Sequence, residues 1–372
     1  MPTPRIQSVE ALTVQVTPRG NWNFARLTTQ NGLVGWGEAT HALGFLRASA
    51  EDDARIAAAV RSFFPALEGL SPFELERFRQ RAWAQAKVGG LLTQTAFSAC
   101  EQALWDLAGQ ALGTPVSELL GGRLVDAVPV YANINRATNE RSPEGFAANA
   151  ARAVEEGFRA LKAAVFDDFP TGESTPAERE AKAELGIRRL EAMRAAVGPS
   201  VDLMVDCHSR FDPELSIEVA RRLEPVRLRW YEEPVDPSRV EDTLRIREHI
   251  AQPMAGGELF FGREGFLPLL ETKAVDVIMP DVKHCGGLFE GKKIAALAET
   301  FGVDVSPHNP SGPLSMAASA QLAATLPNCP VLEHAWGEVP WRAELLDPPE
   351  RFVDGKIVLS DQPGLGHKLV PR

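Results

Sequence analysis

The sequence predicts an α/β protein, a (β/α)₈-type (modified TIM) barrel that follows an amino-terminal α+β domain. Residues 1–125 read as antiparallel strands followed by helices, whereas residues 126–335 alternate short apolar strands with amphipathic helices about eight times. Charged residues also recur where the predicted strands of the second region end. Alternation of this kind indicates a parallel sheet, and eight units favour a closed barrel. We expect residues 336–372, which are rich in Pro and Gly, to pack back on the first domain.

The first domain is predicted from its turn and helix signals. Residues 6–17 and 23–39 are β-rich, and the Asn31-Gly32 pair in the second stretch is typical of a hairpin turn. Residues 51–70 and 93–113 carry apolar residues at helix spacing, and the second helix should end near Gly113.

The predicted barrel strands are short apolar runs, each followed by a segment with a helical pattern. They are predicted at residues 127–134, 159–166, 201–206, 227–234, 253–258, 274–281, 303–308 and 330–334.

Composition excludes several classes of protein. The 50 acidic and 39 basic residues give a formal charge of -11, which argues against a nucleic-acid partner. No stretch approaches the length of a membrane span, and the amino terminus has no apolar core of signal-peptide length. The four cysteines lack CxxC spacing and are expected to be reduced thiols. We therefore expect a cytoplasmic protein without membrane association.

Nearly every predicted barrel strand ends in an ionisable residue. The active site of such a barrel lies at the carboxyl ends of its strands. A purely structural barrel would not gather so many buried charges at one rim, because each needs a partner or a metal. The residues at this rim are Lys162, Asp206, His208, Glu232, Glu233, Glu258, Asp281, His308 and Glu333.

Three of these acids predict a metal site. Asp206, Glu232 and Glu258 follow one another at intervals of 26 residues (232 − 206 and 258 − 232), which is one β/α unit per step. Carboxylates that close would raise each other's pKa unless a cation neutralised them. Oxygen ligands without Cys or His suit a hard ion such as Mg²⁺. Alternatively, any one of these acids could cap the helix that follows it.

Two pairs of an acid and a histidine stand at the same rim. Asp206 and His208 are two positions apart, so in a strand they would point the same way. Asp281 and His308 end neighbouring strands, and a carboxylate beside an imidazole orients it as a general base requires. His308 alone could equally be structural, and we interpret His284 and His334 as structural.

The motifs together resemble the enolase superfamily and, within it, the mandelate racemase subgroup, over essentially the whole chain. The amino-terminal "LTTQNGLVGWGEA" and "ALWDLAGQALGTPVSELLGG" are similar to the family's capping domain. The successive barrel motifs are "DCH", "YEEP", "GGE", "MPDVKHCGG", "SPH" and "LEH". The resemblance implies that Asp206, Glu232 and Glu258 bind Mg²⁺ and that Asp281 orients the base His308. It also implies that Glu333 contacts the substrate carboxylate, and that Glu233 makes a salt bridge or hydrogen bond rather than binding metal.

Two departures indicate which member of the family the chain resembles. Where members often have Lys-x-Lys, this chain has Lys162 and then Ala164, which cannot transfer a proton. This disfavours a two-base racemase or a cycloisomerase, and leaves Lys162 to contact the substrate carboxylate. "D-x-H" is similar to the acid-sugar dehydratases, in which this histidine protonates the departing 3-hydroxyl. His308 and His208 would then be base and acid, giving a 2-keto-3-deoxy acid.

The sequence does not indicate which sugar acid is the substrate. Residues 17–24 and 40–46 fall where the family's lid loops lie, and residues 166–175 could form another wall. Candidate specificity residues are Arg19, Trp22, His41 and Arg210, each of which could instead have a simple loop role. Arg210 could assist the metal site or a distal substrate oxygen.

Two other functions stay open. One is an epimerase, racemase or cycloisomerase acting on a carboxylate substrate. The other is a non-catalytic regulatory protein that binds a metabolite. A homo-oligomer is implied by the resemblance.

Overall fold

The amino-terminal region is a three-stranded antiparallel sheet covered by helices. The computed structural model describes residues 4–17, 20–43 and 49–370. The sheet has the order β1-β2-β3. Its strands are β1 (Ile6–Thr17), β2 (Gly20–Thr29) and β3 (Val34–Glu38), and its helices are α1 (Ala50–Arg61), α2 (Phe64–Leu67), α3 (Leu75–Val88), α4 (Gly90–Leu112) and α5 (Val116–Leu119).

The local sequence signals explain most of these elements. β2 and β3 pair antiparallel around the turn at Asn31-Gly32, where Gly32 has a φ of 86°, a value that glycine adopts easily. α4 ends at Gly113 in the left-handed conformation, as predicted. The single helix predicted for residues 51–70 is divided into two helices, α1 and α2, and Pro65 lies in the first turn of α2. Helix α3 was not predicted.

Eight parallel strands follow, and they carry the predicted site residues. They are β4 (Ala127–Asn133), β5 (Ala160–Ala163), β6 (Asp202–Asp206), β7 (Leu228–Glu232), β8 (Met254–Gly256), β9 (Val277–Ile278), β10 (Asp304–Val305) and β11 (Leu332–Ala335). Each strand from β4 to β9 pairs with the next one in the sequence, and β11 pairs with β4. Between β10 and β11 the Glu333 N–H donates to the Pro307 carbonyl at 3.3 Å, without a continuous ladder.

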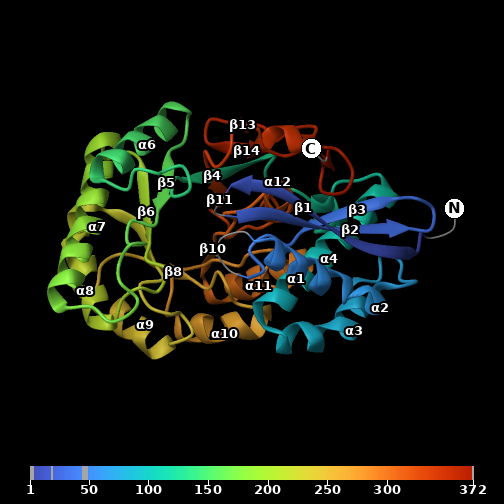
Figure 1. The fold of residues 1–372 in the computed structure, drawn as a ribbon, viewed down its shortest axis with the longest axis horizontal. Coiled ribbons are helices and arrows are strands. Elements are labelled where there is room, and N and C mark those ends of the chain that lie inside the picture. Colours follow the sequence, from blue (N-terminus) through green and yellow to red (C-terminus); the bar gives the residue numbers. More distant parts are fainter. Residues whose placement is uncertain (1–3, 18–19, 44–48, 371–372) are drawn as a thin grey trace.

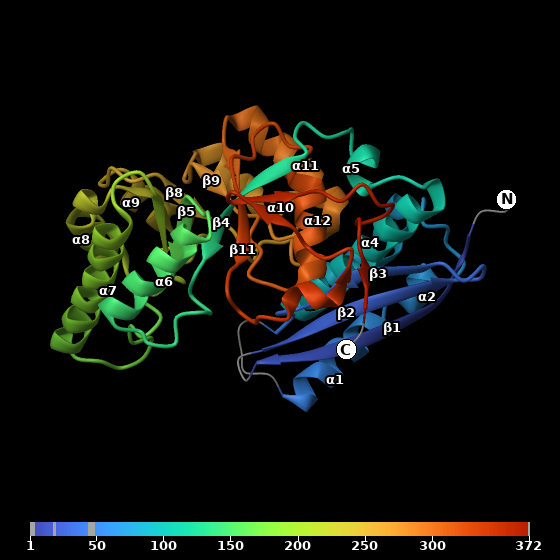
Figure 2. The same ribbon diagram turned by 90° about the horizontal axis from the view of Figure 1, so that it is seen from above.

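Seven α-helices separate these eight strands in residues 126–335, where the sequence predicted about eight units. They are α6 (Pro143–Glu155), α7 (Pro176–Val197), α8 (Pro213–Arg222), α9 (Val240–Arg247), α10 (Gly262–Thr272), α11 (Gly287–Phe301) and α12 (Pro313–Ala323), with a 3₁₀ turn at Glu224–Val226. In Figures 1 and 2, α6–α8 lie at one end of the molecule and the β1–β3 sheet at the other, with α10 and α11 between them.

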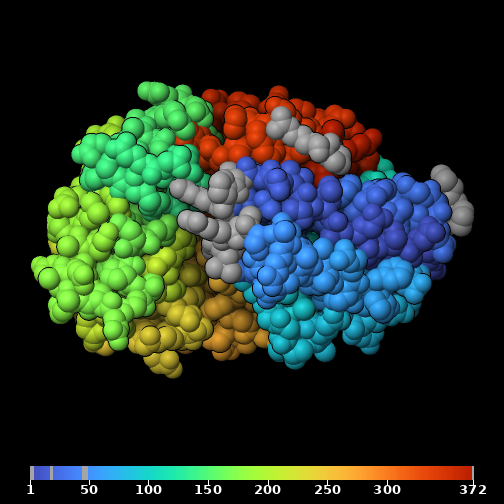
Figure 3. Space-filling view, viewed as in Figure 1, coloured from blue at the N-terminus to red at the C-terminus, as the bar shows by residue number. Residues whose placement is uncertain are grey.

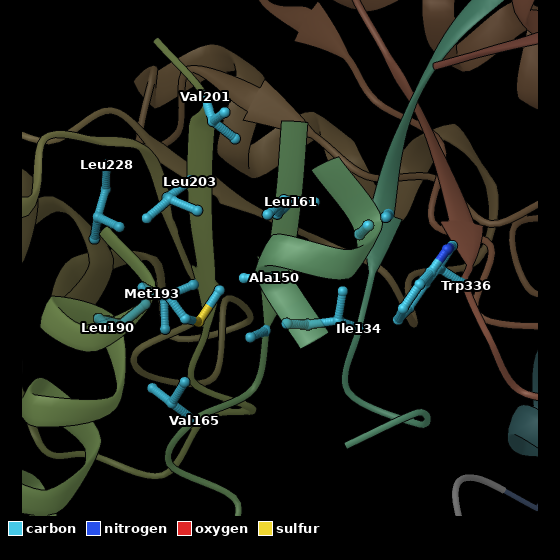
Figure 4. Close-up of a cluster of buried hydrophobic side chains, with 14 of the residues drawn as sticks. Ile134, Ala150, Leu161, Val165, Leu190, Met193, Val201, Leu203, Leu228 and Trp336 are labelled. Atoms are coloured by element: carbon cyan, nitrogen blue, oxygen red, sulfur yellow. The ribbon is translucent and has the colours of Figure 1, made fainter. Parts of the chain in front are cut away.

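Side chains from strands and outer helices form the core that supports the rim. One cluster joins Leu161 and Leu203 on the strands to Leu190 and Met193 on α7 (Figure 4), and all four are fully buried. A second cluster lies among the strands and includes Met204 and Trp230. Close packing on both sides of the strands holds their ends at fixed positions.

The last residues contact both earlier regions. They contain a 3₁₀ turn (Arg342–Leu345), β12 (Leu346–Asp347), β13 (Phe352–Val353), β14 (Lys356–Val358) and β15 (Lys368–Leu369). β14 pairs antiparallel with β4, while Leu345 and Leu369 pack in a cluster with Trp22 and Phe24 of the amino-terminal sheet. The blue and red parts of the chain meet in Figure 3. The domain boundaries at residues 125 and 335 remain predictions.

Buried acids of the amino-terminal region bind the first turns of two barrel helices. The Glu38 carboxylate accepts the backbone N–H groups of Gly312 and Ser315 at α12, both at 2.7 Å. Glu101 on α4 accepts the N–H groups of residues 288 and 289 at α11, at 2.7 and 2.9 Å. Helix amino termini favour negative charge because their first N–H groups have no partner within the helix.

Candidate functional site

Three acids from consecutive strands meet at one point. Asp206 ends β6, Glu232 ends β7, and Glu258 follows β8 by two residues. One carboxylate oxygen from each lies within 4.8 Å of the other two, and all three residues are buried. The sequence therefore predicted correctly that these acids come together.

Lys162 on β5 is the cation nearest to this group of acids. Its Nζ lies 2.7 Å from Glu232, 3.2 Å from Glu333 and 3.9 Å from Asp206, and the residue is only 1% exposed. Burial alone would lower the pKa of Lys162, but these carboxylates hold it well above its usual value. One ammonium shared by several carboxylates leaves uncompensated negative charge.

The pKa values of the three acids shift in different directions: those of Glu232 and Glu258 are raised, and that of Asp206 is lowered. Burial raises the pKa of Glu232 to about 8 against the effect of Lys162. Burial, and then repulsion from Glu233 and Asp206, raises the pKa of Glu258 well above its usual value. Burial would also raise the pKa of Asp206, but His208 and Lys162 outweigh it, so this pKa is lowered.

The triad fits a divalent metal ion. Its donors are hard oxygens, and Glu258 Oε2 is buried without a hydrogen bond among the described residues, although His308 Nε2 lies 3.0 Å away. A cation at this point would neutralise Glu232 and Glu258, whose pKa values are raised by burial and by neighbouring carboxylates.

A histidine and an acid face the triad from the next two strands. His308, after β10, donates from Nδ1 to Asp281 Oδ2 at 2.8 Å. Its Nε2 points toward Glu258, at 3.0 Å, and Glu333, at 3.9 Å. Burial would raise the pKa of Asp281, but Lys283, His284 and His308 together lower it. The predicted pairing of Asp281 with His308 is present.

His208 reaches Asp206 through a turn, which differs from the predicted strand alternation. β6 ends at Asp206, and His208 and Ser209 adopt left-handed conformations with φ of 46° and 56°. The His208 N–H donates to Asp206 Oδ1 at 2.9 Å, while Nε2 lies 3.0 Å from Oδ2. The Asp206 carboxylate thus stabilises this turn, because an aspartate side chain readily accepts a hydrogen bond from the backbone N–H two residues later. The two residues are adjacent, but the geometric reason given for it was wrong.

Asp167 is a site residue that the sequence analysis did not single out. It lies after β5 and accepts from His208 Nδ1 at 2.6 Å. Asn135 and Arg141 also donate to Asp167, at 3.1 and 3.4 Å. Burial would lower the pKa of His208, but Asp206 and Asp167 raise it well above its usual value. The two adjacent acids after β5, Asp167 and Asp168, were the available signal, but the sequence analysis interpreted this segment only as a possible wall of the site.

Glu233 and Glu333 both make hydrogen bonds that organise the rim. Glu233 Oε1 accepts the N–H groups of Gly257 and Glu258, at 2.8 and 3.3 Å, and so positions a member of the triad. Glu333 accepts from the Asn133 amide at 2.7 Å and from the Asn309 N–H at 2.8 Å. Burial would raise the pKa of Glu333, but Lys162 and His308 lower it.

His284 and His334 are held away from the triad. His284 shares a 2.8 Å hydrogen bond with Thr95 on α4, and burial lowers its pKa to about 3. His334 packs against the rings of Phe158 and Phe352.

A cavity of about 760 Å³ opens over this group. Its wall includes Asp206, Glu258, His308, His208, Asp167 and Arg210. The two histidines therefore face one shared space, which is large enough for a small molecule. Glu232, Lys162, Asp281 and Glu333 are not on this wall and support the residues that are.

The four specificity candidates have different positions. Arg210 lines the cavity, whereas His41 bonds Arg136 of the wall at 2.6 Å. Trp22 is 1% exposed, and its ring packs edge-on against Trp341 at 5.5 Å, away from the cavity wall. Arg19 lies outside the described residues, as do residues 44–46 of the second predicted lid loop. Asp167 and Asp168, from the predicted wall at residues 166–175, do line the cavity.

Comparison with known families accounts for this arrangement. Residues 9–121 match the mandelate racemase / muconate lactonizing enzyme amino-terminal domain, and residues 145–372 match the enolase carboxy-terminal domain-like family. The chain belongs to the mandelate racemase / muconate lactonizing enzyme family. The resemblance drawn from its strand-end motifs is thus confirmed, as is the fold class. Members of the enolase superfamily use a divalent metal, in agreement with the acidic triad.

Relatives and solved structures of the family cover nearly the whole chain. The chain is 36% identical to a D-gluconate dehydratase of Thermoproteus tenax, over 92% of this chain and 67% of that protein. It is 33% identical to a D-xylonate dehydratase of Haloferax volcanii, over 99% of this chain and 89% of that protein. A crystal structure of a mandelate racemase/muconate lactonizing enzyme from Sulfitobacter sp. superimposes with a TM-score of 0.88 at 28% identity, covering 99% and 94% of the two chains.

Two further expectations concern the whole chain. Among the described residues, no helix combines the length and apolar character needed to cross a bilayer. All four cysteines are free thiols, as the sequence predicted.

Proposed function

We propose that the protein is a Mg²⁺-dependent sugar-acid dehydratase, a hydro-lyase that converts an aldonic or aldaric acid into a 2-keto-3-deoxy acid. One observation carries this proposal. Two imidazoles, each held at Nδ1 by its own carboxylate, face one cavity beside the acidic triad. Removal of water from neighbouring carbons needs a base for the α-proton and an acid for the departing hydroxyl.

The chain's own residues supply the two proton transfers. His308, oriented by Asp281, takes the α-proton at Nε2, and protonated His208, oriented by Asp167, gives a proton to the 3-hydroxyl, which leaves as water. The enol that remains becomes the 2-keto-3-deoxy acid. Glu333, with Lys162 beside it, is not on the cavity wall but lies 3.9 Å from His308 Nε2, and it is proposed to contact the substrate carboxylate there.

Asp206, Glu232 and Glu258 are proposed to hold Mg²⁺, which suits an all-carboxylate site. When bound, the ion supplies positive charge to stabilise the negative charge that develops on the substrate carboxylate.

The sequence around Ala164 favours dehydration over racemisation. Ala164 is buried and lacks an ionisable group, so it supplies no second base at the position where a lysine would act. The named relatives act on D-gluconate and D-xylonate, which supports an aldonic acid as the first substrate class to test. A homo-oligomer and a cytoplasmic location remain predictions.

The test is a panel of aldonic and aldaric acids with Mg²⁺, with the 2-keto-3-deoxy product trapped by semicarbazide. The matched variants are His308→Asn and His208→Asn, run in deuterated water. His308→Asn should lose both dehydration and α-deuterium exchange, whereas His208→Asn should lose dehydration and keep exchange. An isomeric product without loss of water would show an epimerase, and binding without turnover on the whole panel would show a regulatory protein. Either result would replace the proposal.

A further inference from the structure

A fully buried lysine stands beside the acid that orients His308. Lys283 follows β9, two residues after Asp281, and both residues are 0% exposed. Burying an ammonium costs several kcal/mol unless a charged partner compensates for it. Lys283 Nζ donates to Asp281 Oδ2, so the fold places a compensated charge pair directly behind the base.

Lys283 holds both oxygens of the Asp281 carboxylate. Its backbone N–H donates to Oδ1 at 2.7 Å, and its Nζ donates to Oδ2. His308 Nδ1 donates to that same Oδ2 at 2.8 Å, and His284 Nε2 lies 3.8 Å from it. The carboxylate therefore cannot rotate without breaking a bond to Lys283.

We propose that Lys283 is a positioning residue for the general base. It keeps Asp281 an ionised, fixed acceptor, so that His308 carries its proton on Nδ1 and turns the lone pair of Nε2 toward the cavity. This inference rests on the proposed function, in which His308 removes the α-proton from Nε2.

The geometry distinguishes this role from simple filling of the core. A buried lysine needs a charged partner in any case, but either carboxylate oxygen would serve; the Lys283 ammonium donates to Oδ2, the oxygen that His308 also uses. Lys283 also interacts with Glu38 of the amino-terminal region. Burial raises the pKa of Glu38, and the positive charge of Lys283 opposes this rise. The same side chain thus lies between the amino-terminal region and the base.

The experiment compares Lys283→Gln, which keeps a donor but removes the charge, with Lys283→Arg, which keeps both. Lys292→Gln is the matched control, because Lys292 is a partly buried lysine on α11 that donates to Thr325, away from Asp281. We expect Lys283→Gln to lower kcat by about 10- to 100-fold, the range typical of residues that orient a functional group, with KM changed by less than about threefold. Lys283→Arg should recover part of the loss, and Lys292→Gln should behave as wild type.

Nitrogen-15 NMR of labelled histidine supplies a readout that does not depend on turnover. The His308 signals, assigned by their absence in His308→Asn, should show the proton on Nδ1 in the wild type and a mixture of tautomers in Lys283→Gln. Binding of Mn²⁺ should be unchanged, which separates this effect from damage to the triad.

Three results would overturn the proposal: a wild-type proton on Nε2, a kcat of Lys283→Gln within twofold of wild type, or an equal loss in Lys292→Gln. If Lys283→Gln does not fold, the wild-type and Lys283→Arg tautomers decide the question. If the wild type dehydrates no sugar acid, the proposed function fails, while the NMR result still decides the role of Lys283.

Discussion

The loop that orients His208 depends on a charge pair whose contribution to stability can be calculated. Asp168 accepts from Arg189 on α7 at 2.7 and 3.2 Å and from Lys182 at 3.0 Å. The Arg189 side chain is 3% exposed and also donates to the Val165 carbonyl at 2.6 Å. Asp168→Asn removes the only charge paired with this buried guanidinium among the described residues, next to Asp167, which holds His208.

The expected loss follows from the pKa of Asp168. Burial would raise this pKa, but Arg189 and Lys182 lower it from 3.8 to about 2. A difference of 3.8 − 2 = 1.8 units corresponds to about 2.4 kcal/mol. Because the Asp168 side chain is 31% exposed, solvent screening reduces the expected loss at pH 7 to about 1–2 kcal/mol.

The lowered pKa of Asp168 determines how the stability of the folded protein changes with pH. A lowered folded-state pKa gives stability that is fully present above 3.8 and is lost as the pH falls toward 2. Urea unfolding of wild type and Asp168→Asn from pH 7 down to pH 3 should therefore show two proteins whose stabilities converge, with roughly half of the difference left near pH 3.

Asp202→Asn is the matched control. Asp202 pairs with Arg229 at 2.7 Å, but both side chains are more exposed, so its loss should cost less than about 1 kcal/mol. A difference between wild type and Asp168→Asn that grows on acidification, or that is no larger than the control's at pH 7, would contradict the assigned role of the Asp168–Arg189 pair.

Three further predictions concern the site and its support. Asp167→Asn should lower kcat by about 10- to 100-fold in steady-state assays, because His208 Nδ1 loses its carboxylate, and an unchanged kcat would remove Asp167 from the acid's support. Chelation with EDTA should lower the melting temperature, since saturating metal at about 100 times Kd adds about 2.7 kcal/mol of stability. Glu258→Gln should abolish that difference, and a protein equally stable with and without Mg²⁺ would argue against the triad as its site. Trp22→Ala should cost about 3–5 kcal/mol in urea unfolding while leaving KM within about twofold, because Trp22 packs on Trp341 rather than on the cavity. A large rise in KM would restore Trp22 as a specificity residue.

The acidic triad could be predicted because its signal is regular. Asp206, Glu232 and Glu258 repeat with the period of one β/α unit, and parallel strands deliver such residues to one edge. The same logic placed Asp281 beside His308. These predictions need only the order of the strands, which alternating sequence patterns reveal.

Other parts of the site depend on contacts that no local pattern encodes. Asp167 meets His208 across 41 residues, through a segment whose backbone carbonyls accept from Arg141 and Arg189. Lys283 could be seen in "PDVKH", but a lysine in sequence carries no sign that it will be buried. Trp22 was expected near the substrate because residues 17–24 fall where the family's lid loops lie, yet its side chain packs against the distant carboxy-terminal segment.

The contacts of Glu38 and Glu101 with the barrel have a consequence for how such proteins can be recombined. α11 begins six residues after Asp281, and α12 begins five residues after His308. The two helix ends that these acids bind therefore belong to the loops that carry the proposed base and its partner. An amino-terminal domain exchanged from another protein would have to bring acids to the same two helix ends. A graft lacking them would leave buried N–H groups at both loops without acceptors, at about 1–3 kcal/mol each. We therefore expect that swapping the amino-terminal domain can change the substrate preference only when the new domain also has acids at the positions of Glu38 and Glu101.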